Sequence, residues 1–178
     1  METKVITVRA QVIELAVVLS LLVLLCLVCP IVQFNNQFFI GPMVNCTLIY
    51  AGVRFKGFLK TASIVCLPSA CAITLGMLGF TGIYAMYMIP FIWAGNTAIV
   101  LGFKYLFSKR NYVTTAVVSI AVKAALIFGG YYLLLTAGAI PAGSPIATVM
   151  WSAMGVYQLI TAAAGSVLAF GVLRLVRR

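Results

Sequence analysis

Few side chains in this sequence could take part in chemistry. The chain contains no His, and its two carboxylates are Glu2 and Glu14. These residues supply neither the paired carboxylates of general acid–base catalysis nor an imidazole metal site, so we expect no catalytic residue, metal or cofactor. The C-x-x-C pair of Cys26 and Cys29 could interconvert between dithiol and disulfide. Because no connecting segment carries a second Cys pair to relay electrons, the sequence favours a protein that is not an enzyme.

A second group of interest is Lys123, a basic residue within an apolar stretch. It follows Tyr112 by eleven positions, so at about 1.5 Å per helical residue it lies about 16 Å along that segment. A charge at that depth in a membrane marks a functional site by default. Two interpretations remain open. Lys123 contacts a ligand, or it is structural and either pairs with Glu14 or extends its ammonium toward the cytoplasm.

Other polar or amphipathic residues fall at depths close to that of Lys123. In the stretch Ile89 to Asn96, Pro90 predicts a kink that could aim side chains into a cavity. If these residues converge, they form an apolar pocket with aromatic walls, several amides and one cation, the usual composition of a small-molecule site. The alternative is that the amides bond across helix interfaces. The expected pocket residues are Asn45, Trp93, Asn96, Lys123, Trp151 and Gln158.

The composition indicates where these residues must be held. Of 178 residues, 64% are hydrophobic and 8% are charged, and the mean hydropathy is +1.17, whereas a soluble domain has about 25% charged residues. This predicts an integral membrane protein and excludes a soluble catalytic or nucleotide-binding domain. Interruptions in the apolar sequence predict one transmembrane domain over residues 1–178 with six helices, at about 11–32, 38–54, 58–80, 83–107, 112–136 and 146–174.

The charges are distributed unevenly between the two sides of these predicted spans. Eleven of the 12 basic residues lie before the first span, between spans two and three, between spans four and five, or after the last span. The other connections carry no charge. The positive-inside rule therefore places both termini in the cytoplasm. The same rule explains the formal net charge of +10, so we expect a lipid bilayer as the partner and not a nucleic acid.

The pattern resembles the substrate-binding S component of energy-coupling factor transporters, which import vitamins and micronutrients in prokaryotes. The resemblance covers the whole chain in its size, six helices and neutral outer connections. The stretch Ile89 to Asn96, IPFIWAGN, is similar to the fourth span of several such proteins, and Lys123 follows in the fifth. The resemblance implies a multi-pass protein of the prokaryotic cytoplasmic membrane that captures a small solute from outside. It also implies a transmembrane coupling subunit and two cytoplasmic ABC ATPases as partners.

The sequence departs from that family in its first span. Many members have an Ala-x-x-x-Ala face there for docking the coupling subunit, whereas Ala10 and Ala16 are six positions apart and Glu14 lies between them. The docking surface is therefore not carried over. Lys123 favours an anionic or carboxylated solute, and the two Trp residues favour a flat ring.

Two other functional classes remain open. A structural or assembly subunit of a larger membrane complex, or a small channel, would need only packing surfaces such as the small residues at 162–171. A thiol-redox membrane enzyme would depend on Cys26 and Cys29. Solute binding is the preferred interpretation because it also uses the polar residues at membrane depth.

Overall fold

The structure, a computed structural model, describes residues 2–31, 37–55, 57–74 and 82–176. The side chains of 2–9, 25–31, 58–59 and 72–74 lie outside this description, and the Cys26 and Cys29 thiols with them. The regular secondary structure of the described residues is all helical, which confirms the predicted helical class for these residues. Its elements are α1 Glu2–Ile31, α2 Gln37–Arg54, α3 Phe58–Thr74, α4 Gly82–Tyr87, α5 Ile89–Tyr105, α6 Tyr112–Thr136, α7 Pro145–Met154 and α8 Val156–Val176.

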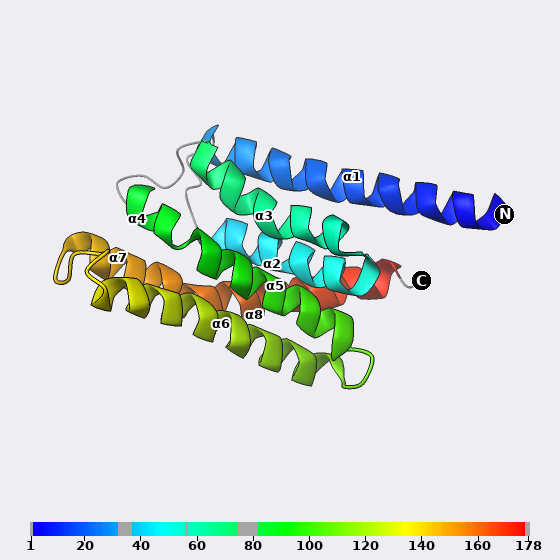
Figure 1. The fold of residues 1–178 in the computed structure, drawn as a ribbon. Helices are drawn as coiled ribbons and strands as arrows, with labels where there is room; N and C mark the ends of the chain where they lie inside the picture. The colour runs from blue at the N-terminus through cyan, green and yellow to red at the C-terminus, as the bar shows by residue number, and fades with distance from the viewer. Residues whose placement is uncertain (1, 32–36, 56, 75–81, 177–178) are drawn as a thin grey trace.

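The long helices run alternately in opposite directions (Figure 1). Two short helices extend longer ones, since α4 precedes α5 and α7 precedes α8, each pair following one general direction. The N and C labels consequently lie at the same end of the bundle. The described Lys and Arg residues other than Lys123 also lie toward this end, which we call the basic end: Lys4, Arg9, Arg54, Lys60, Lys104, Lys109, Arg110 and Arg174.

Two stretches of the described chain are long and apolar enough to cross a membrane, Tyr112–Thr136 and Pro145–Val176. The first matches the predicted span 112–136, and the second contains the predicted span 146–174. Helices α2, α3 and α5 have 18, 17 and 17 residues, slightly fewer than the about 20 that span a bilayer without local thinning.

Two of the predicted spans each contain two helices. The span 83–107 is divided at Met88, where a new helix begins with Pro90 in its first turn. Proline has no backbone N–H to continue the preceding helix, so it is favoured at a new start. The span 146–174 is divided at Gly155, whose backbone (φ −101°, ψ −100°) is not helical. Both breaks lie toward the end opposite the basic end.

Local sequence also explains where α6 and α7 begin. The Asn111 side chain accepts a hydrogen bond from the Thr114 backbone N–H at 2.8 Å and caps α6. The Ser144 hydroxyl accepts one from the Ala147 N–H at 3.2 Å, and Pro145 follows at the first position of α7. Such N-caps satisfy backbone donors that have no partner within the helix. These two caps set the residues at which the two membrane-crossing candidates begin.

Four helices surround the centre of the bundle. Helix α2 packs against α8 and α5, and α6 packs against α5 and α8, while α1 and α3 cover one side. The core contains two apolar clusters along the bundle axis. On α5, Ile99 and Phe103 belong to the cluster nearer the basic end, whereas Met88 belongs to the other. On α6, Ala116 and Ile127 divide in the same way, so a layer lies between the clusters at about Asn96 and Lys123.

The outward faces of the long helices are apolar. Large hydrophobic side chains are exposed on α1, α6 and α8, among them Ile13, Val113, Val117, Val167 and Leu175. Soluble monomers seldom expose contiguous apolar surface of this extent. Together with the two membrane-crossing candidates, this surface fits a hydrocarbon environment.

The contact between α2 and α8 depends on Gly165. A Cβ atom there would lie 2.5 Å from the Asn45 Cβ and 2.7 Å from the Pro42 carbonyl oxygen. On the same helix, Gly171 has no neighbouring atom within 4 Å of such a Cβ. We expect Gly165→Val to destabilise the fold by about 1–3 kcal/mol through overpacking, measured by thermal unfolding in detergent. Gly171→Val is the matched control, and an equal loss in both variants would contradict this packing.

Candidate functional site

A buried hydrogen bond between Lys123 and Asn45 lies at the centre of the four helices. The Lys123 Nζ donates to the Asn45 Oδ1 at 2.6 Å, and the two residues are 3% and 2% exposed. The Asn45 amide nitrogen donates in turn to the Gly41 carbonyl at 2.8 Å, which fixes which amide atom faces the ammonium. The bond connects α6 with α2, two helices that are separated by α5 and α8 around the ring. We call this contact the Lys–Asn pair.

The Lys–Asn pair lies near the middle of the helices that contribute to it. Asn45 is nine residues from Arg54, the last residue of α2, and Lys123 is eleven from Tyr112, the first of α6. At about 1.5 Å per residue, both lie about 14–17 Å from the basic end. The agreement of the two depths is what allows a lysine and an asparagine from different helices to meet.

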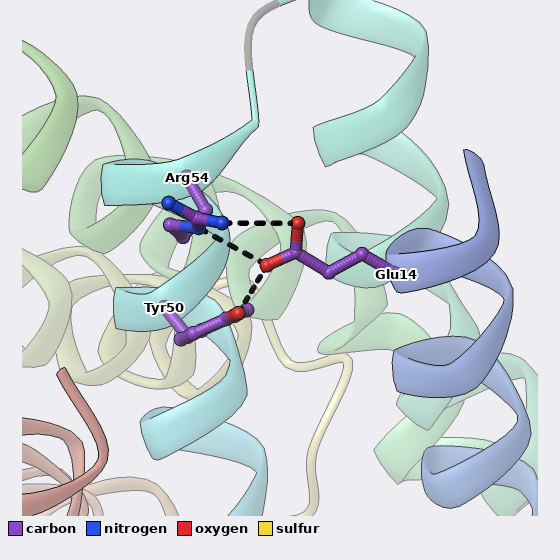
Figure 2. A network of polar contacts seen from close by, with 3 residues as sticks. All are labelled: Glu14, Tyr50 and Arg54. Carbon is purple, nitrogen blue, oxygen red and sulfur yellow. Dashed lines mark hydrogen bonds and ion pairs between the residues drawn. The ribbon is translucent and has the colours of Figure 1, made fainter. Parts of the chain in front are cut away.

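Glu14 does not neutralise Lys123 in this structure. Its carboxylate accepts hydrogen bonds from the Tyr50 hydroxyl and from the Arg54 guanidinium, whose Nε lies 3.0 Å from Oε1 (Figure 2). Both partners are on α2, so the cluster attaches α1 to α2. Of the two structural interpretations of Lys123, pairing with Glu14 is therefore not the arrangement found. Nor does Lys123 extend to the cytoplasm, since its Nζ bonds to a buried amide.

Asn96 is buried on α5 at a depth close to that of the Lys–Asn pair. Its amide nitrogen donates to the Val65 carbonyl of α3 at 3.4 Å, and 3% of the residue is exposed. The preceding residue, Gly95, faces α6, where an added Cβ would lie 3.1 Å from the Lys123 Cγ. Asn96 thus connects one face of α5 to α3. On a different face of α5, the absence of a side chain at Gly95 leaves room for the Lys123 side chain.

Ser119 is a further polar residue of this layer, and it was not among the expected pocket residues. It is 1% exposed, and among the described residues its Oγ is a buried side-chain atom without a hydrogen-bond partner. It precedes Lys123 by four positions, so the two side chains lie on one face of α6. That spacing was the signal in the sequence that could have indicated Ser119.

The two tryptophans lie apart from this layer. Trp93 is 38% exposed and Trp151 is 49% exposed. Trp151 makes an edge contact with Phe128, their ring centroids 6.2 Å apart. With Tyr131 and Gly143, Trp151 also lines a hollow of about 250 Å³ near the end of α6 opposite the basic end. The structure therefore gives these aromatic rings surroundings other than the Lys–Asn pair.

Gln158 belongs to a polar contact at the start of α8. Its amide nitrogen donates to the Ala153 carbonyl at 3.2 Å, and the Gln37 amide donates to the same oxygen at 3.0 Å. Ala153 lies two residues before the break at Gly155, so its carbonyl is available to side chains. The contact joins the start of α2 to the junction of α7 and α8.

A line of polar or small residues leads from this contact to the Lys–Asn pair. Gln37, Gly41 and Asn45 are spaced by four on α2 and lie on one face. Opposite them on α8, Thr161 lies against Gly41, where an added Cβ would lie 2.7 Å from the Thr161 Cβ. The seam between α2 and α8 is therefore a partly polar connection between Lys123 and the end opposite the basic end, which we call the neutral end.

Other hollows in the described chain are lined by different residues. One of about 320 Å³ lies among α1, α2 and α8 and includes Glu14 and Tyr50. Another of about 420 Å³ lies at the basic end between α2 and α5 and includes Gly52 and Phe103. The Lys–Asn pair is enclosed by its helices, so a solute would reach it only if those helices separated.

The buried polar groups of this layer include hydrogen-bond donors. An ammonium has three donors and no acceptor, and the hydrogen bond to Asn45 uses one of them. The described residues contain no group of three or more His, Cys, Asp or Glu side chains that could hold a metal ion. Cys46 and Cys66 are free thiols. The buried groups could therefore donate hydrogen bonds to an acceptor.

The fold and site define an all-helical bundle with a buried Lys–Asn pair and two segments capable of crossing a membrane. Comparisons with protein-family models, with curated proteins and with solved structures find no match to this chain. The functional interpretation therefore depends on the residues themselves.

A double-mutant cycle tests whether Asn45 stabilises the buried ammonium. We expect Asn45→Leu to cost about 3–5 kcal/mol because it leaves a buried charge without its hydrogen-bond acceptor. Lys123→Met removes the charge, so adding it to Asn45→Leu should recover part of that loss. The free energy of unfolding is measured for each variant in the same detergent. Strictly additive losses would contradict the coupling of the two side chains.

Proposed function

We propose that the chain is a multi-pass protein of a prokaryotic cytoplasmic membrane, with six crossings and the basic end in the cytoplasm. The alternating directions of the helices support this arrangement (Figure 1). The collection of basic residues at one end supports the orientation, because Lys and Arg are retained on the cytoplasmic side. The divided pairs α4 with α5 and α7 with α8 each serve as one crossing.

Labelling of single cysteines tests this topology. In a variant without the five native cysteines, Ala142→Cys lies in the exposed connection between α6 and α7, and Ser108→Cys lies at the basic end. With a membrane-impermeant maleimide, we expect Ala142→Cys to react in intact cells and Ser108→Cys to react only after permeabilisation. The reverse pattern would invert the topology, and equal labelling in intact cells would exclude six crossings.

We further propose that the protein is the solute-binding S component of an energy-coupling factor type importer. The observation that carries this proposal is the buried amino group of Lys123, which bonds to a neutral amide in the middle of the bundle. Retaining an intramembrane charge without a carboxylate partner is costly, and such charges usually serve a solute or ion. Asn45, Asn96 and Lys123 form the central part of the proposed site.

The remaining expected pocket residues take other parts in this proposal. Gln158 and Gln37 close the seam between α2 and α8 at the neutral end, which would face the outside. Separation of this seam would admit a solute toward Asn45. Trp151 lines the outer hollow near this route, and Trp93 lies at the bundle surface. The proposed solute is small, because the residues around Lys123 are closely packed.

In this proposal transport requires partner proteins, because no energy-coupling site is identified among the described residues. A transmembrane coupling subunit and two cytoplasmic ABC ATPases would supply the energy. Helix α1 offers them an exposed face that includes Ala10, Ala16 and Ser20. Small residues allow another helix to approach closely, and α1 lies at the edge of the bundle (Figure 1).

Co-purification tests the proposed partnership. The tagged chain is isolated from its native membranes in a mild detergent, and bound proteins are identified by mass spectrometry. We expect a second membrane protein and two ABC-type ATPases. Ala16→Trp should reduce their recovery several-fold, whereas Val167→Trp, which adds the same side chain to an exposed position of α8, should not.

Other outcomes of this experiment favour other functions. Recovery of a membrane complex without ATPases would overturn the importer proposal in favour of a structural or assembly subunit. The wild-type chain purified without partners, under conditions that preserve a known complex, would favour a channel that acts alone.

A further inference from the structure

Lys123 has no carboxylate partner among the described residues. Its hydrogen-bond partner, Asn45, is neutral, and the Glu14 carboxylate is engaged with Arg54 and Tyr50. The sequence has one other acidic residue, Glu2, and the helix that begins there starts at the basic end. When Lys123 is protonated, a ligand with one negative charge would neutralise the site. A phosphate group, with a charge of about −1.5 to −2, would leave excess negative charge in the core.

The donors of the site also match a carboxylate. Lys123 has N–H donors beyond the one directed at Asn45. Ser119 supplies a buried hydroxyl without a partner, one turn nearer the start of α6. Long side chains on a helix point back toward its N-terminus, which is the side of Lys123 on which Ser119 lies. The Ser119 Oγ faces α5, where an added Cβ on Gly102 would lie 2.0 Å from it. A carboxylate has two oxygens, one for each donor.

We propose that the solute is a small monocarboxylate, whose carboxylate accepts hydrogen bonds from the Lys123 ammonium and the Ser119 hydroxyl. This rests on the proposed solute-binding function and specifies the chemical class of the solute. Asn45 holds the ammonium in the core before the solute arrives. The bound carboxylate then supplies the opposite charge that the protein lacks, and Ser119 acquires its hydrogen-bond partner.

Paired probes of equal shape test this proposal. The purified chain in detergent is heated with acetate, butyrate or benzoate, and separately with acetamide, butyramide, benzamide or phenylphosphonate. At least one carboxylate should raise the unfolding temperature of the wild type, because a ligand that binds the native state stabilises it. The neutral amides and the phosphonate should not. Absence of a shift with every carboxylate, or an equal shift with the matching amide, would overturn the proposal.

Variants locate the binding in the same experiment. Lys123→Met should abolish the shift caused by the carboxylate. Ser119→Ala should weaken the apparent affinity about tenfold, as expected for one hydrogen bond to a charged group. Ser108→Ala, which removes an exposed hydroxyl at the basic end, is the matched control and should leave the affinity unchanged. An undiminished shift in Lys123→Met would place the carboxylate elsewhere and overturn the assignment.

The two proposals fail separately. If ATPases co-purify with the chain but no carboxylate binds, the importer function stands and the solute class is wrong. If a carboxylate binds through Lys123 and no ATPases are recovered, the site stands and the importer function is wrong.

Discussion

The interaction on which this structure most depends is the hydrogen bond from Lys123 to Asn45. An ammonium in an apolar interior is strongly destabilising unless it is hydrogen-bonded, and this one lies between two apolar clusters of the core. The bond spans the ring of helices from α6 to α2. The side chains of α5 and α8 must therefore be small where the Lys–Asn pair crosses, and Gly95 and Gly165 occupy those positions.

The polar contacts away from the centre have different roles. Glu14, Tyr50 and Arg54 attach the peripheral helix α1 to α2 near the basic end (Figure 2). Gln37 and Gln158 join α2 to the junction of α7 and α8 at the opposite end. The chain thus places a carboxylate where a surface arginine can pair with it and leaves the central lysine without one. This separation of charges supports a site that an anionic solute completes.

The sequence predicted how deep each polar residue lies along its helix, but not which face of the helix turns toward the core. Apolar length predicts a helix at 112–136, and the structure has α6 at those residues. Pro90 predicted a kink within one helix, and the structure begins a new helix at Ile89 instead. Counting along the predicted spans gave Asn45 and Lys123 similar depths. Which face of each helix turns inward depends on packing between helices, so counting could not separate buried Asn96 from exposed Trp93, three positions away.

The most direct test of this account is solid-state NMR of the protein in lipid bilayers, with ¹⁵N-labelled lysine and ¹³C-labelled asparagine. The Lys123 Nζ signal is assigned by its loss in Lys123→Met. The account predicts a short-range correlation between this Nζ and the side-chain carbonyl carbon of Asn45, which disappears in Asn45→Leu. A Lys123 signal that correlates with lipid headgroups or water, and not with Asn45, would contradict a central buried ammonium.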